Sequence, residues 1–208
     1  MTCYEERIAT FVAGYRGLSR QAGVVACFHD IRNFRYLSDG VRDPDRVLQR
    51  KAGSCSGKHM VLRDCLLAVG EDAYIETVEG DFAAGVPVHA SMSPGLQALV
   101  RDKQVQDFHQ FVMWHGVGGA CRLDATWPDG LVEFGFEVNA SWQGVGDTKL
   151  ALAPDRFHGR SDDIQKDKAE LLATLLPAQV ERRSVFLDEF SKWVAIITNA
   201  PKGGNNVH

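Results

Sequence analysis

The stretch KAGSCSGKHMVLRDCLLAVG, residues 51–70, carries the clearest structural signal in the chain. Four apolar side chains recur at the spacing that places them on one face of an α-helix: Leu62, Cys65, Leu66 and Val69. Glycines and serines surround Cys55 just before this pattern, and Gly70 is a natural helix stop. The stretch predicts a helix over residues 56–69, with Cys55 at or just before its start and Cys65 buried on its apolar face.

A cysteine in this position has a chemical advantage. The free N–H groups and the positive dipole end of a helix N-terminus favour the thiolate over the thiol. The small neighbours of Cys55 allow close approach of a substrate, and backbone N–H groups there could hold an oxyanion. Cys55 is therefore a candidate nucleophile, and the alternative is a partly buried small residue.

A thiol nucleophile needs a base, and the base needs an orienting group. The segments FHQFVMWH (108–115) and ACRLDATW (120–127) predict two antiparallel strands around a glycine-rich turn. A turn centred on Gly116-Val117 places His109 directly opposite Asp124, on the same face of the sheet. A turn centred on Gly118-Gly119 pairs His109 with Pro128 instead, and the turn residues exclude neither register.

The remaining patterns predict the rest of the architecture. Helices are expected over 4–36 with an interruption at Gly23, from Pro44 to before Gly53, and over 95–103, 162–176 and 178–197. Strands are expected over 73–79 and 131–138, with a loop over 80–95 and an irregular segment over 154–160. This order predicts an α+β fold with a mainly antiparallel sheet, in a single domain over 1–208.

Composition excludes several classes of partner. The net charge of −4 and the lack of a basic, aromatic-rich stretch argue against a nucleic-acid partner. The chain lacks an apolar run of membrane-spanning length, and its first residues lack the pattern of a signal peptide. Five cysteines, odd in number and scattered, indicate free thiols in a reducing compartment, so the expected location is cytoplasmic.

These motifs together resemble the transglutaminase-like superfamily of cysteine enzymes, in the manner of a small bacterial member. The matching stretches are IRNFRYLSDGVRDPDRVL (31–48), GSCSGKHMVLRDCLLAVG (53–70), FHQFVMW (108–114) and RLDATW (122–127), which together cover about 28–130. The resemblance implies a papain-like fold, with the nucleophile helix packed on an antiparallel sheet. It also implies that Cys55 is the nucleophile, His109 the general base and acid, and Asp124 the orienting carboxylate.

Two departures leave the subfamily, and so the substrate, open. Gln110 stands where many members have alanine, and Ala125 follows Asp124 where many have proline. The C-terminal helical extension, about 160–198, has no counterpart in the resemblance. Such folds also need an oxyanion donor upstream of the nucleophile. Tyr36 is the candidate, with simple packing as the alternative.

The implied reaction is acyl transfer from a peptide, protein or small amide or ester through a thioester on Cys55. Water as acceptor makes a protease or amidase, whereas an amine makes a transglutaminase or amide-forming enzyme. The mechanism requires no cofactor or metal. Three tryptophans near the sheet line an acyl pocket or pack in the core: Trp114, Trp127 and Trp142.

Two other classes of function compete with this interpretation. Cys55 and His59, four residues apart on a helix, could share a zinc ion with His29, His89 or His115; otherwise His59 is expected to be an exposed helix residue. A non-catalytic binding module on the same fold is the second alternative.

Overall fold

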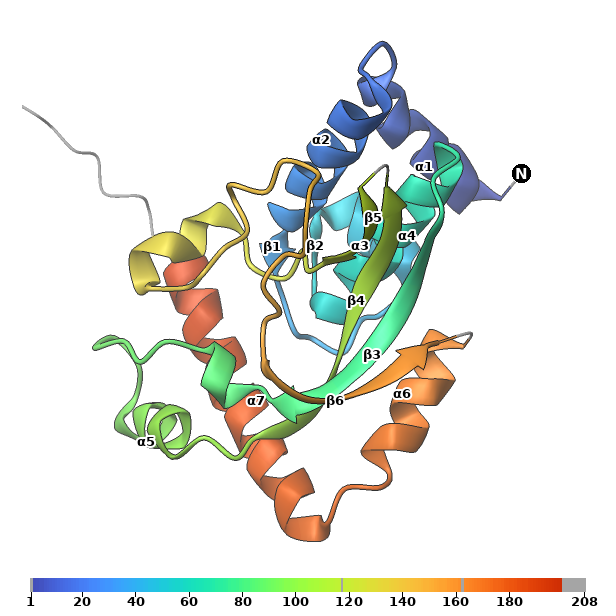
Figure 1. Cartoon of the computed structure of the whole chain (residues 1–208). Helices are drawn as coiled ribbons and strands as arrows, with labels where there is room; N and C mark the ends of the chain where they lie inside the picture. The colour runs from blue at the N-terminus through green and yellow to red at the C-terminus, as the bar shows by residue number, and fades with distance from the viewer. Residues whose placement is uncertain (1, 117, 162, 200–208) are drawn as a thin grey trace, which may run out of the picture.

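The computed structural model describes residues 2–116, 118–161 and 163–199. Its centre is a curled antiparallel sheet in the order β5–β4–β3–β6, with helices packed on it (Figure 1). The four strands are β3 (Ala73–Asp81), β4 (Gln106–Gly116), β5 (Gly119–Leu123) and β6 (Ala153–Arg160). The predicted α+β class with an antiparallel sheet is confirmed at this level.

The N-terminal region consists of helices joined by a short parallel strand pair. The helices are α1 (Cys3–Val12), α2 (Arg20–Arg32), α3 (Pro44–Arg50) and α4 (Cys55–Ala68), and a 3₁₀ turn, η1 (Ala13–Tyr15), follows α1. The strands are β1 (Arg35–Tyr36) and β2 (Ala52–Gly53). Local sequence explains the boundaries: the Asp43 side chain accepts from Asp45 N–H, and Pro44 occupies the first helical position.

The predicted interruption at Gly23 is wrong, because Gly23 lies inside α2 and its N–H bonds to the Ser19 carbonyl. The chain turns earlier, near Gly17, whose φ of +93° is a conformation that favours glycine.

Three more helices and two 3₁₀ turns complete the described structure. The helices are α5 (Pro94–Asp102), α6 (Ile164–Leu172) and α7 (Pro177–Asn199), and the turns are η2 (Ala83–Gly85) and η3 (Asp129–Phe134). Asp163 caps α6 by accepting from Lys166 N–H at 3.2 Å.

Two of the predicted segments are wrong. The first half of the strand expected over 131–138 belongs to η3, which ends at Phe134 and is capped by Gly135 with φ +85°. Not all of its apolar residues are buried, since Leu131 is buried and Val132 is exposed. The segment expected to be irregular contains β6, an edge strand paired only with β3 among the described strands. Because β6 is mostly exposed, it has no apolar alternation to reveal it.

Two hydrophobic cores share the sheet. The first includes α4 residues such as Val61 and Leu62 together with Val112 and Leu123 of the sheet. The second joins the sheet to α5 and α7, with Phe186 and Phe190 at its centre. Figure 1 shows α1–α4 gathered at one end of the curled sheet, with α5 and α7 toward the other. The segment after β5 crosses between the cores, because Ala125 belongs to the first and Trp127 to the second.

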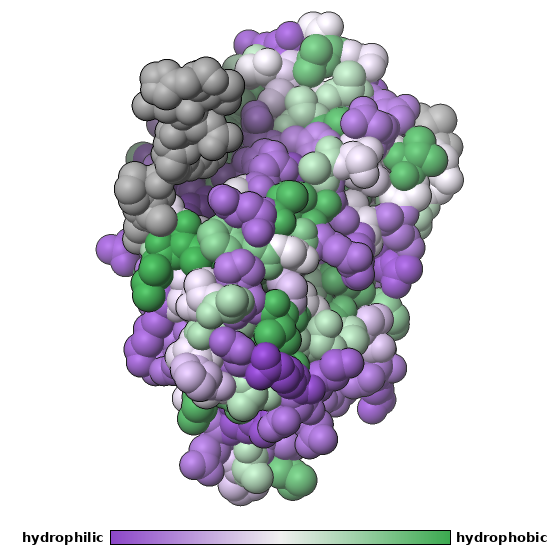
Figure 2. All heavy atoms as spheres, turned by 90° about the vertical axis from the view of Figure 1, so that its left-hand side faces the viewer, coloured by the Kyte–Doolittle hydropathy of each residue, from purple (hydrophilic) through white to green (hydrophobic). Residues whose placement is uncertain are grey.

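On the face shown in Figure 2, hydrophobic residues are scattered among hydrophilic ones. Within the described ranges, no helix combines the length and apolar character needed to cross a membrane.

Candidate active site

Cys55 is the first residue of α4, as the sequence predicts. Close packing of α3 fixes this helix start: a Cβ on Gly57 would lie 2.8 Å from Val47 Cγ2, and one on Gly53 would lie 2.9 Å from Val47 Cγ1. These glycines therefore permit α3 to pack directly against the α4 N-terminus. Cys55 is 8% exposed, and its Sγ lies 4.0 Å from the Ser56 Oγ.

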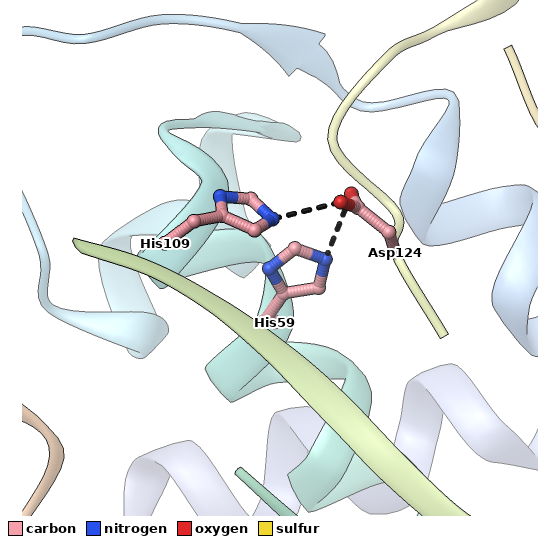
Figure 3. Close-up of side chains that lie close together, drawn as sticks. All are labelled: His59, His109 and Asp124. Carbon is pink, nitrogen blue, oxygen red and sulfur yellow. Dashed lines mark hydrogen bonds and ion pairs between the residues drawn. The ribbon is translucent and has the colours of Figure 1, made fainter. Parts of the chain in front are cut away.

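His109 on β4 and Asp124 just after β5 are brought into direct contact. The His109 Nε2 to Asp124 Oδ2 distance is 2.7 Å, and both residues are 1% exposed (Figure 3). Neither register considered from the sequence is the observed one. Met113 pairs with Arg122 and Gly116 with Gly119, so the turn centre lies one residue beyond Gly116-Val117; Val117 itself lies outside the described residues.

His109 and Asp124 are in contact in the observed register for a geometric reason. Continued past the end of β5, the observed register sets Phe111 opposite Asp124. His109, two residues from Phe111 on the same strand, is then the diagonal neighbour of Asp124 on the same face. The shift by two residues preserves the face, so the imidazole still reaches the carboxylate.

The Asp124 carboxylate is held by main-chain donors as well as by His109. Thr126 N–H donates to Oδ1 at 2.9 Å, and Ala151 N–H donates to Oδ2 at 2.7 Å. Burial works against ionisation, but the charge and hydrogen bond of His109 hold the pKa of Asp124 well below its usual value. Asp124 is therefore a fixed anion that orients His109.

His109 and Cys55 influence each other electrostatically. Burial lowers the pKa of His109, but the negative charges of Asp124 and Cys55 outweigh it and raise the value to about 10. Burial likewise opposes ionisation of Cys55, yet the positive charges of Lys168 and His109 bring its pKa down to about 7. The His109 Nδ1 atom is buried without a hydrogen-bond partner. The Cys55 thiol therefore lies within range of the His109 charge.

His59 is a further member of this group, and the expectation that it is exposed is wrong. It is 0% exposed, and its Nε2 accepts the Ala125 N–H at 2.7 Å. That nitrogen must therefore be unprotonated, and burial lowers the pKa of His59 in the same sense. Although His59 Nε2 lies 3.5 Å from Asp124 Oδ1, two acceptors cannot form a hydrogen bond. The helical spacing from Cys55 to His59 was the only sequence signal for this placement.

Donor and acceptor roles also bear on metal binding. In the part of the chain that the structure describes, the one cluster of converging metal-ligand atoms is His59, His109 and Asp124, all within 4.8 Å of one another. Cys55 is not a member of it. The lone pair of His59 Nε2 is taken by Ala125 N–H, and His109 Nε2 donates to Asp124. These hydrogen bonds use the Nε2 atoms of both histidines, whereas their Nδ1 atoms are buried without a hydrogen-bond partner.

The other histidines of the zinc alternative have partners of their own. His29 Nε2 lies 2.8 Å from the Trp142 carbonyl oxygen, and His89 Nδ1 lies 2.8 Å from Ser91 Oγ. His115 is an exposed residue near the end of β4.

Tyr36 lies on β1, beside the strand that leads into Cys55, because it pairs with Gly53. Its ring packs 4.9 Å from that of Trp127, and the residue is 4% exposed. Burial and the nearby charge of Cys55 raise the pKa of Tyr36, which keeps its hydroxyl protonated. The side chain is packed as the alternative predicted, and its role as an oxyanion donor stays a prediction.

The three tryptophans have different surroundings. Trp114 and Trp142 pack edge to face in the first core, with ring centroids 6.0 Å apart. Trp127 lines a cavity of about 650 Å³ that also has Leu150 and Arg122 in its wall. Of the three, Trp127 is the one that borders an open space among the cavities described.

The C-terminal helices contribute polar groups that sequence analysis missed. Lys168 Nζ on α6 donates to Ser56 Oγ at 3.3 Å, next to Cys55. Arg183 Nε on α7 donates to Asp107 Oδ1 at 2.8 Å, on the strand that carries His109. Burial raises the pKa of Asp107, but the charges of Lys168 and Arg183 lower it overall. No motif marked these residues, because their stretches read as ordinary amphipathic helices.

Comparison with known proteins does not place the chain in a family: no family model, curated protein or solved structure matches it.

Proposed function

We propose that the protein is a cysteine-dependent acyl-transfer enzyme in which Cys55, His109 and Asp124 act as a catalytic triad. The observation that carries the proposal is the orientation of His109. One ring nitrogen binds the fixed carboxylate of Asp124, and the other is buried, unpaired and within electrostatic range of a thiol at a helix N-terminus. A Cys–His–carboxylate arrangement of this kind supports nucleophilic catalysis.

The chemistry follows from these positions. The Cys55 thiolate attacks the carbonyl carbon of an amide or ester, and His109 gives its proton to the departing amine or alcohol. A thioester to Cys55 remains. His109 then takes a proton from the acceptor, which attacks the thioester and releases Cys55 as thiolate, while Asp124 holds the imidazole in place. Tyr36 and the free N–H groups at the start of α4 are the proposed oxyanion donors.

The proposed acyl donor is a peptide, protein or small amide, and the acceptor is water or an amine. Within this proposal, the fold is of the papain-like, transglutaminase type, since the nucleophile helix precedes the strand of His109 and the segment of Asp124 in the chain. The C-terminal helices are additions to that core.

The experiment combines labelling with a donor panel. The exposed Cys3 is an internal reference thiol. We expect iodoacetamide to modify Cys55 faster than Cys3 near pH 7, despite its burial, and His109→Ala to slow this modification. The rate should rise with pH through about 7, where Cys55 ionises, and the thiolate–imidazolium pair should persist up to about pH 10, where His109 loses its proton.

Peptide, glutamine-amide and thioester donors, each with and without amines, then identify the reaction. Mass spectrometry should detect an acyl adduct on Cys55, absent in Cys55→Ala, and the released product names the acceptor.

The 8% exposure of Cys55 favours one competing function, a non-catalytic binding module on the same fold. No adduct with any donor, together with alkylation of Cys55 no faster than Cys3, would support that module and overturn the enzyme. Stoichiometric zinc in purified protein, lost in Cys55→Ala, would instead favour the metal-binding alternative.

A further inference from the structure

Lys168 brings a buried positive charge from the C-terminal region to the candidate nucleophile. The residue is 5% exposed, and its ammonium donates to the Ser56 hydroxyl at 3.3 Å. Ser56 follows Cys55 in the first turn of α4, with its Oγ 4.0 Å from Cys55 Sγ. Burial of an ammonium group is costly unless a negative partner compensates it, so the surroundings of Lys168 need an anion.

The docking of α6 explains why this lysine points inward. Gln110 Nε2 on β4 donates to the Ile164 carbonyl at 2.9 Å, which fixes the first turn of α6 to the sheet. Ile164 packs in the first core, and Lys168, four residues later, lies on the same helix face. Lys166 lies off that face, and its side chain is 68% exposed.

The charges around the thiol leave a place for one more anion. The ionisable groups that influence Cys55 lie on four elements: Tyr36 on β1, Lys58 on α4, Asp107 and His109 on β4, and Lys168 on α6. His109 is compensated by Asp124, and Asp107 is shared between Lys168 and Arg183. Because Asp107 serves two cations, ionisation of Cys55 supplies a second negative charge for Lys168 and Arg183.

We infer that Lys168 is a positioning residue of the Cys55 site: its ammonium, held beside Ser56 by the docked helix α6, stabilises the Cys55 thiolate. This inference rests on the proposed function and extends it by making the C-terminal helices part of the active site. It agrees with the electrostatics, in which the charge of Lys168 and the charge and hydrogen bonding of His109 lower the pKa of Cys55.

The test is the pH profile of Cys55 alkylation, followed peptide by peptide with mass spectrometry. An opposite charge within a few ångströms shifts a pKa by about one unit or more. We therefore expect Lys168→Met to raise the alkylation midpoint of Cys55 by about one pH unit and to slow labelling at pH 7 by roughly fivefold. If the methionine variant does not fold, Lys168→Gln replaces it. The glutamine keeps a polar group for Ser56 but removes the charge, and the same rise in the alkylation midpoint of Cys55 is expected.

Two controls separate charge from packing. Lys166→Met changes an exposed lysine of the same helix and should leave the midpoint unchanged. Lys168→Arg keeps the charge, and its midpoint should stay near the wild-type value. If Lys168→Arg raises the midpoint as much as Lys168→Met does, the effect comes from packing, and the inference is overturned.

The failures of the two proposals are distinguishable. If wild-type Cys55 reacts no faster than Cys3, the proposed function fails. If wild-type Cys55 is selectively reactive but its midpoint is the same in Lys168→Met, only the role of Lys168 is overturned.

Discussion

Two pairs of buried side chains with the same chemistry flank the candidate site. Lys58 and His59 come from α4, and Lys168 and His109 come from α6 and β4. The first pair bonds to main-chain atoms. Lys58 donates to the carbonyls of Arg32 at 2.7 Å, Phe34 at 3.0 Å and Thr126 at 2.9 Å, and His59 accepts a backbone N–H.

The second pair bonds to polar side chains. Lys168 makes a single 3.3 Å bond to a hydroxyl, and His109 binds a carboxylate and leaves Nδ1 unpaired. All four residues are buried, and the residue types are the same in the two pairs, so neither property separates structure from chemistry here. The Nδ1 atoms of His59 and His109 are both buried without a hydrogen-bond partner, so the difference lies in the bonds that are made. Lys58 and His59 bond to backbone atoms, whereas His109 bonds to a carboxylate and Lys168 to a hydroxyl beside Cys55.

The largest expected effect breaks the first pair. Lys58→Met removes all three donors and leaves three buried carbonyls unpaired, each an unfavourable desolvated group. We expect the free energy of unfolding to fall by about 3 kcal/mol or more, measured by urea denaturation. Lys168→Met, which removes one long hydrogen bond and a buried charge, should change it by under about 1 kcal/mol. Equal losses in the two variants would contradict the contrast between the pairs.

The next largest effect concerns Asp124, the carboxylate that holds His109 of the second pair. Asp124→Asn keeps the shape but offers one acceptor oxygen in place of two to His109, Thr126 and Ala151. We expect turnover with an identified donor to fall at least about a hundredfold, as the imidazole loses its orientation and charge stabilisation. Asp147→Asn, at an exposed ion pair with Arg122, is the matched control and should keep its activity. Full activity in Asp124→Asn would remove Asp124 from the triad.

The smallest effect sharpens the distinction between the two imidazoles. His59→Gln retains an acceptor for Ala125 N–H and leaves the His109–Asp124 bond in place. We expect acyl transfer to change by less than about fivefold, whereas His109→Gln should lose at least about a hundredfold. Steady-state rates on one donor, with thermal melts to verify folding, make the comparison. A loss in His59→Gln as large as in His109→Gln would assign both imidazoles to the chemistry.

Local patterns in the sequence predicted the parts of the site that depend on short-range order. The small residues around Cys55 and the apolar spacing after it predicted a helix start, and α4 begins there. Strand periodicity predicted one face for His109 and Asp124. His109 and Asp124 share a face although the predicted turn centre was wrong, because a pairing register shifted by two residues leaves each side chain on the same face of the sheet.

The tertiary structure alone decided which polar side chains are buried around Cys55. Lys58 and His59 are polar residues, yet α4 is enclosed on nearly all sides over its first two turns and buries both. Lys168 and Lys166 are the same residue type two positions apart, and only the docking of Ile164 and Gln110 selects Lys168 to face the thiol. Sequence periodicity encodes the direction of a side chain relative to its own element, whereas burial depends on where distant elements pack, and no local pattern carries that information.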